Sequence, residues 1–189
     1  LVERAVGTVE EALLEATILV VILLLLFLGD IRASLIVAAA LPMATLVTFI
    51  LMKQFGMSAN LMSLGGLAIA IGMLVDGAVV VIENVVERLS DPGHAHAGKL
   101  NRVLVATSEV VVPVASGLFI IALVFLPLLT LEGLEGKLFG PVAMTIVLAL
   151  ASSLVLALTL VPVLASYGLK ADGEHKEPWL MRQLSPRYH

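Results

Sequence analysis

Five long apolar stretches, separated by short polar segments, constrain this 189-residue chain more than any other feature of it. A helix needs about 20 predominantly apolar residues to cross the roughly 30 Å hydrocarbon core of a bilayer. Residues 33–52, 110–131 and 138–169 contain no charged side chain at all. We therefore expect an all-α fold, a polytopic membrane bundle of five transmembrane helices. The predicted spans are residues 12–28, 33–52, 60–84, 103–131 and 138–167.

The composition favours a membrane protein for the same physical reason. Hydrophobic residues make up 60% of the chain and charged residues 14%, against roughly 45–50% and about 25% in soluble globular proteins. The net charge of −4 argues against a nucleic-acid partner. Because the chain has no cysteine, disulfides, thiolate metal sites and cysteine nucleophiles are excluded within it.

Polar segments flank the predicted bundle at both ends. Residues 1–11 are predicted to form an amphipathic lead-in, and residues 170–189 a cytoplasmic tail. The tail is expected to begin an interfacial helix, with Trp179 as its anchor among the headgroups. The chain begins with Leu1, and no signal-peptide pattern follows. We therefore expect it to be a segment of a longer protein.

The lysines and arginines predict the orientation of the bundle, because cytoplasmic loops carry an excess of these residues. Of the 11 basic residues, eight fall on one side of the predicted membrane and three on the other. We expect the richer side to be cytoplasmic, with the N-terminus periplasmic and the C-terminus cytoplasmic. The eight are Arg32, Arg88, Lys99, Arg102, Lys170, Lys176, Arg182 and Arg187, and the three are Arg4, Lys53 and Lys137.

The third predicted span carries charge inside the membrane. At about 100° per residue, Gly65, Gly72, Asp76 and Glu83 share one stripe of the helix. Glycines let a neighbouring helix approach closely, so Asp76 is expected inside a helix bundle. An intramembrane carboxylate costs a few kcal/mol or more and is by default a functional candidate. A carboxyl group in apolar surroundings can gain and lose a proton near neutral pH, which predicts a proton relay at Asp76.

Plainer interpretations remain open for both carboxylates. Asp76 could make a structural hydrogen bond or ion pair between helices. Glu83 lies nearer the cytoplasmic end, where snorkelling toward water explains a carboxylate as well as proton transfer does. Glu15 and Glu109 are assigned to helix ends, where we expect them to be solvated.

The third span also resembles a known family. The run from Asn60 to Asn84, with Gly-Met-Leu-Val-Asp-Gly at its centre, resembles the fourth transmembrane helix of RND efflux transporters. Its likeness is strongest to their heavy-metal efflux subgroup. Residues 27–32 resemble that family's junction between the second and third helices, and residues 138–141 the start of its sixth helix. The resemblance covers essentially the whole chain, as helices two to six.

This resemblance implies a function that spacing alone does not. RND transporters are inner-membrane proton antiporters that assemble as homotrimers and export metal cations or organic compounds. They act with a periplasmic adaptor and an outer-membrane channel. The aspartate of their fourth-helix proton relay matches Asp76, and the carboxylate seven residues later matches Glu83. The rest of the transporter, including its porter domain and missing helices, would then be a partner of this segment.

The metal signatures of the subgroup are incomplete here. Divalent-cation members often carry a second aspartate where this chain has Ala70. Met62 matches a methionine of copper and silver members, whose thioether chain would be broken at Leu74 and Leu150. Met62 is thus a candidate metal ligand, with helix packing as the plainer explanation. The pair His94 and His96 lacks the further ligands that a closed metal site needs.

Three other functions are weighed against heavy-metal export. Pumps for organic compounds commonly have two adjacent aspartates, whereas Gly77 follows Asp76 here. An intramembrane aspartyl protease needs two aspartates sharing a proton, and Asp76 is the one aspartate deep in a predicted span. A truncated fragment without activity of its own is the third alternative. We expect no enzymatic activity and no cofactor.

Overall fold

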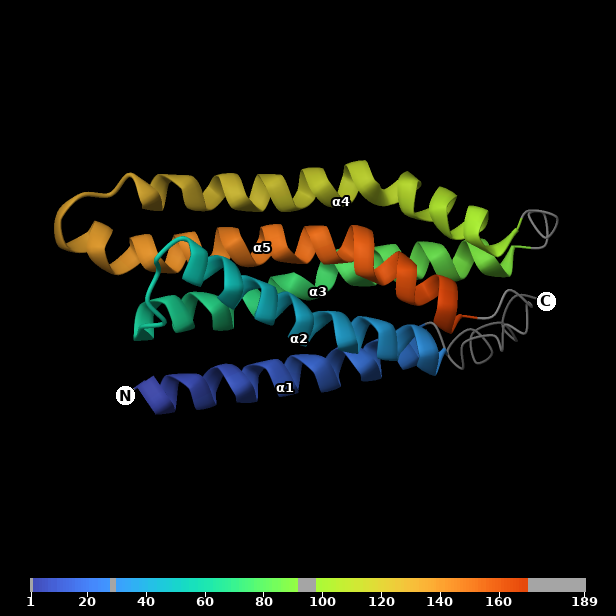
Figure 1. Ribbon diagram of the computed structural model, residues 1–189, viewed down its shortest axis with the longest axis horizontal. Helices are drawn as coiled ribbons and strands as arrows, with labels where there is room; N and C mark the ends of the chain where they lie inside the picture. The colour runs from blue at the N-terminus through green and yellow to red at the C-terminus, as the bar shows by residue number, and fades with distance from the viewer. Residues whose placement is uncertain (1, 28–29, 92–97, 170–189) are drawn as a thin grey trace, which may run out of the picture.

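A computed structural model describes residues 2–27, 30–91 and 98–169. The described chain forms five α-helices and no strand, which confirms the all-α prediction. The helices run alternately up and down in one elongated bundle (Figure 1). They are α1 (Val2–Phe27), α2 (Ile31–Gln54), α3 (Leu61–Ser90), α4 (Lys99–Leu129) and α5 (Gly133–Gly168).

Helix ends are set by side chains that satisfy backbone groups. Asp30 precedes α2, and its carboxylate accepts a hydrogen bond from the Arg32 backbone N–H at 2.8 Å. Asn60 and Ser63 form a capping box at the start of α3, each side chain accepting from the other residue's backbone N–H at 2.9 Å. Gly56, in the turn between these helices, has a φ of +67°, a conformation that glycine adopts without steric cost.

The core lies where α3 and α5 pack together, with α2 and α4 also packed on α5. Leu41, Leu67, Ile82 and Ile146 are almost completely buried there. At the Leu61 end of α3 the two backbones touch: a Cβ built on Gly66 would lie 2.8 Å from the carbonyl oxygen of Val142. A larger residue at this position would force α3 and α5 apart.

α1 differs from the prediction at its beginning. The helix is continuous from Val2, so the expected lead-in of residues 1–11 is not a separate element in the described part. Helices α2 to α5 are each long and apolar enough to cross a membrane, and a shorter apolar helical stretch, Leu13–Leu23, is found among the described residues of α1. Glu10 and Glu11, both exposed, precede that stretch. A membrane span in α1 therefore stays a prediction.

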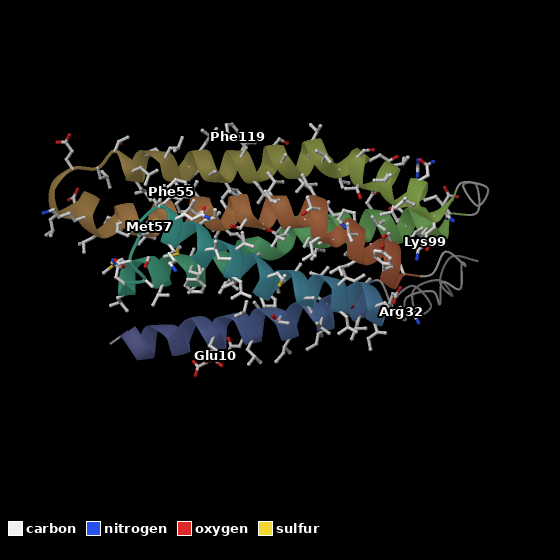
Figure 2. All side chains as sticks on the ribbon, viewed as in Figure 1. Glu10, Arg32, Phe55, Met57, Lys99 and Phe119 are labelled. Atoms are coloured by element: carbon white, nitrogen blue, oxygen red, sulfur yellow. The ribbon has the colours of Figure 1, made fainter. Side chains whose placement is uncertain are left out.

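The outer face of α4 is apolar and uncovered. Val112, Phe119 and Val124 are each 65% exposed or more, and Phe119 lies on the side of α4 away from the other helices (Figure 2). Such a face suits lipid or further helices rather than water. The predictions for Trp179, His94 and His96 fall on residues outside the described ones.

Candidate functional site

Asp76 lies at the midpoint of α3, 15 residues after Leu61 and 14 before Ser90. At 1.5 Å per residue it is about 21–22 Å from each end of the helix. Its side chain is exposed within this chain and makes no hydrogen bond or ion pair with the described residues. If α3 spans a bilayer, Asp76 therefore lies near the middle of the membrane.

Two open grooves flank Asp76, one on each side of α3. The groove toward α1 has a volume of about 380 Å³, and the groove toward α4 about 260 Å³. Asp76 is the single titratable residue among the described side chains lining either groove. The other residues lining the two grooves are Ala16, Leu19, Leu23, Gly72, Gly77, Val79, Val80, Pro113, Val114, Gly117, Leu118 and Ile121.

Asp76 is exposed within this chain, and the other residues that line the two grooves beside it are apolar. The described residues place no cation beside Asp76. An ionisable side chain within a membrane span is by default a functional candidate.

Glu15 lies in the middle of α1, and the expectation that it lies near a helix end is wrong. It follows Val2 by 13 residues and precedes Phe27 by 12. Together with Gly72 it lines a third groove of about 420 Å³ between α1 and α3. The sequence contains a signal for the place of Glu15 in this groove. Leu19 follows it by four residues and therefore lies on the same helix face, so the carboxylate is expected beside apolar side chains.

Glu83 lies on the exposed face of α3, as Asp76 does. The two carboxylates are seven residues apart, which is about 10 Å along the helix. Glu83 does not line the two grooves beside Asp76. At this spacing, a proton could pass between the two side chains only through intervening water.

Gly65 and Gly72 also lie on this exposed face. A Cβ built on either would meet no atom within 4 Å among the described residues. Among the glycines of α3, Gly66 approaches the α5 backbone closely, and a Cβ built on Gly77 would make ordinary contact with the side chains of Val114, Leu118 and Ala157. Close packing at Gly65 and Gly72 stays a prediction, one that needs helices beyond this segment.

Met62 lies in the first turn of α3 and is 38% exposed. It precedes Asp76 by 14 residues, about 21 Å along the helix, so the two do not share a site. No group of three or more His, Asp or Glu residues with metal-binding geometry occurs in the part of the chain that the structure describes. A metal-ligand role for Met62 stays a prediction.

A polar cluster near the Ser90 end of α3 was not predicted. Glu109, expected to be solvated, forms an ion pair with Arg88 at 3.1 Å and accepts a hydrogen bond from Asn84 Nδ2 at 3.2 Å. Arg102 is 5% exposed and donates to backbone carbonyls at the end of α3, including that of Arg88 at 2.7 Å. Spacing along one helix could not reveal these contacts, because they join two helices.

Comparisons with known proteins identify the family of this chain. The family model described as the AcrB/AcrD/AcrF family matches residues 1–188, and the chain belongs to this family.

Relatives of this chain cover it completely. Protein HelA of Legionella pneumophila is 44% identical over 194 residues. The cobalt-zinc-cadmium resistance protein CzcA of Cupriavidus metallidurans is 43% identical over 194 residues. The cation efflux system protein CusA of Escherichia coli is 39% identical over 198 residues. The chain spans only 18–19% of the length of these relatives.

A solved structure supports the same family. The crystal structure of a heavy metal efflux pump matches this chain with a TM-score of 0.70 and 39% sequence identity. The match covers 87% of this chain and 16% of that chain. The described bundle therefore has the fold of part of that much longer chain.

Proposed function

We propose that this chain is part of the inner-membrane permease of a proton-driven heavy-metal cation efflux pump. The observation that carries the proposal is the position of Asp76, a lone carboxylate at the centre of α3 between two apolar grooves. Membership of the AcrB/AcrD/AcrF family supports it, as do the metal-resistance names of the relatives.

In the proposed cycle Asp76 takes up a proton from the periplasmic side and later releases it to the cytoplasm. The two neighbouring grooves between α1 and α3, one lined by Glu15 and the other by Asp76, would carry water toward Asp76. The neutral and charged forms of Asp76 prefer different packing around α3, because a charge demands polar neighbours. Glu83 would be a second carboxylate of the relay on the cytoplasmic side of Asp76.

The remaining parts of the pump would act with this segment. These partners are the missing helices and porter domain of the same transporter, the other subunits of a homotrimer, a periplasmic adaptor and an outer-membrane channel. The exposed face of α3 and the apolar outer face of α4 are surfaces that further helices could cover. In this arrangement the N-terminus of the chain is periplasmic and its C-terminus cytoplasmic.

The cargo is proposed to be a heavy-metal cation, bound as substrate. Met62 and Ala70 favour a soft monovalent ion, because a thioether suits Cu(I) and a hard carboxylate ligand is missing. Leu74 and Leu150 oppose that choice, since neither offers a thioether. One relative is a cobalt-zinc-cadmium resistance protein and another is described only as a cation efflux system protein, so the names of the relatives do not decide the valence of the cargo.

A complementation experiment tests this function. A bacterial strain lacking its metal exporters would express the full-length transporter that contains this segment. We expect increased tolerance to copper, silver, zinc, cobalt or cadmium, together with lower metal content in the cells. Tolerance gained only to dyes, detergents or antibiotics would support a pump for organic compounds and reject the metal assignment.

A further inference from the structure

Three side chains join the Ser90 end of α3 to α4, and we call them the α3–α4 clasp: Asn84, Arg88 and Glu109. Asn84 Nδ2 donates to the Ala106 carbonyl at 2.7 Å and to Glu109 Oε2 at 3.2 Å. The guanidinium of Arg88 pairs with Glu109 Oε1 at 3.1 Å. Residues 84 and 88 are one turn apart and share a helix face. Each oxygen of the Glu109 carboxylate therefore binds a different donor from α3.

A second connection runs in the opposite direction, from α4 to α3. The Arg102 guanidinium donates to the carbonyls of Arg88 at 2.7 Å, Leu89 at 2.5 Å and Asp91 at 3.1 Å. Carbonyls in the last turn of a helix lack intrahelical donors and form the negative end of the helix dipole. Because Arg102 is buried, separating α3 from α4 would leave a charge without partners, which is strongly unfavourable.

The centre of α3 is held quite differently from its two ends. Near its beginning Gly66 contacts the α5 backbone, and near its end the clasp binds it to α4. Between these points Asp76 faces open grooves on both sides. A change in the charge of Asp76 can therefore alter packing at the centre of α3 without breaking the polar contacts of its Ser90 end.

We infer that the clasp makes the Ser90 half of α3 and α4 move as one body when Asp76 changes its charge, with Glu109 as the positioning residue. The inference rests on the proposed function, because it assumes that Asp76 drives the movement. Glu109 lies on α4. Of its two donors on α3, Asn84 lies nearer to Asp76, at eight residues or about 12 Å along the helix. Glu109 therefore acts on the relay only through the position of α3. A carboxylate suits this role because it accepts from a cation and an amide at once.

Chemical cross-linking can replace the ion pair. In the full-length transporter, Arg88→Cys and Glu109→Cys would be combined. This segment contributes no other thiol because it has no cysteine. We expect the double variant to export metal about fivefold more slowly than the unmodified transporter, a size typical of mutations that weaken coupling between sites. A thiol cross-linker as long as the two replaced side chains should restore the rate, because the two helices never need to part.

Two results would overturn the inference. A double variant that exports metal at the unmodified rate would show that the clasp is dispensable, and a cross-link that stops export would show that α3 and α4 must separate. Glu87→Gln is the matched control and should keep the unmodified rate. Glu87 is an exposed carboxylate one residue before Arg88 that makes no hydrogen bond or ion pair with the described residues.

Two further measurements separate this inference from the proposed function. If the unmodified transporter exports no metal, the proposed function fails. The clasp is then judged by a double-mutant cycle on the Tm of the purified transporter, with Arg88→Ala and Glu109→Ala. Coupled residues should give a double variant that loses less than the sum of the single losses, and additive losses would reject the clasp. If export occurs and depends on Asp76, but the cross-link does not restore the export rate of the double variant, only this inference fails.

Discussion

Glu15 of α1 and Asp76 of α3 line neighbouring grooves that share three wall residues, Ala16, Leu19 and Gly72. The two carboxylates belong to helices that are far apart in the sequence but packed together in the bundle. Glu15 lies on the Leu61 side of this shared wall, which is the proposed periplasmic side. The two grooves are thus adjacent along the α1–α3 interface, one beside each acidic group.

Replacing Glu15 should therefore slow proton uptake by Asp76. In the full-length transporter we expect Glu15→Gln to lower the initial rate of metal efflux roughly tenfold, because a positioned carboxyl group hands on protons faster than water alone. Efflux from metal-loaded cells at a fixed external pH measures this rate. Glu10→Gln, an exposed site on the same helix, should leave the rate unchanged. Equal rates for both variants would mean that Glu15 has no part in proton uptake.

Asp76→Asn should abolish metal resistance in the full-length transporter. The amide cannot take up and release a proton, so the variant should behave like the strain without transporter. Immunoblots of membranes should show normal protein levels, because the Asp76 side chain makes no hydrogen bond or ion pair among the described residues. Full resistance in this variant would make Asp76 a structural residue.

The basic residues predict that Ser58 and His94 lie on opposite sides of the membrane. In the full-length transporter, single cysteines introduced at Ser58 and at His94 should react with an impermeant thiol reagent from opposite sides. We expect Ser58→Cys to label in intact spheroplasts and His94→Cys only after the membrane is opened. Labelling of both from one side would refute the proposed orientation.

Gly66→Ala should destabilise the bundle. The added Cβ would lie 2.8 Å from the Val142 carbonyl oxygen, and overpacking of this kind costs about 1–3 kcal/mol. Thermal unfolding of the purified transporter in detergent should show a lower Tm. The control is Gly140→Ala in α5, where a Cβ meets nothing within 4 Å. A Tm for Gly66→Ala as high as that of the control would contradict the close contact of α3 and α5.

Arg102→Ala should destabilise the junction of α3 and α4 by about 1–3 kcal/mol, because it removes the donor from carbonyls at the end of α3, including that of the buried Leu89. Arg32→Ala offers a comparison, since Arg32 is exposed and makes one longer bond, 3.3 Å, to the Gly168 carbonyl. We expect a clearly smaller loss of Tm for Arg32→Ala than for Arg102→Ala. Similar losses would show that burial of Arg102 adds nothing to its capping of α3.

The fold could be predicted because its signals are local. Long apolar runs predict the existence of the helices α2 to α5, and the polar segments between them predict that the helices are separate, whereas the helix bounds differ from the predicted spans by up to six residues. The limit of α1 could not be predicted, since Glu10 and Glu11 interrupt the apolar pattern but not the helix. Glutamate is a good helix former, so the helix begins well before the apolar segment that hydropathy identifies.

The site could be predicted only along a single helix. The spacing of Gly65, Gly72, Asp76 and Glu83 predicts a shared face of α3, and all four lie on its exposed side. Contacts between helices were missed, as the pairing of Glu109 with two α3 residues shows. Such contacts depend on how helices are rotated against each other, and no periodicity within one helix contains that information.

The central position of Asp76 places it between two points at which α3 is attached to other helices. Gly66, against α5, precedes it by ten residues, about 15 Å, and Asn84, bound to α4, follows it by eight, about 12 Å. A helix attached at two such points would respond to a force at its centre by bending there or by moving its attached neighbours. A change of charge at Asp76 would therefore reach the two membrane surfaces through α5 and α4 rather than through free movement of the ends of α3.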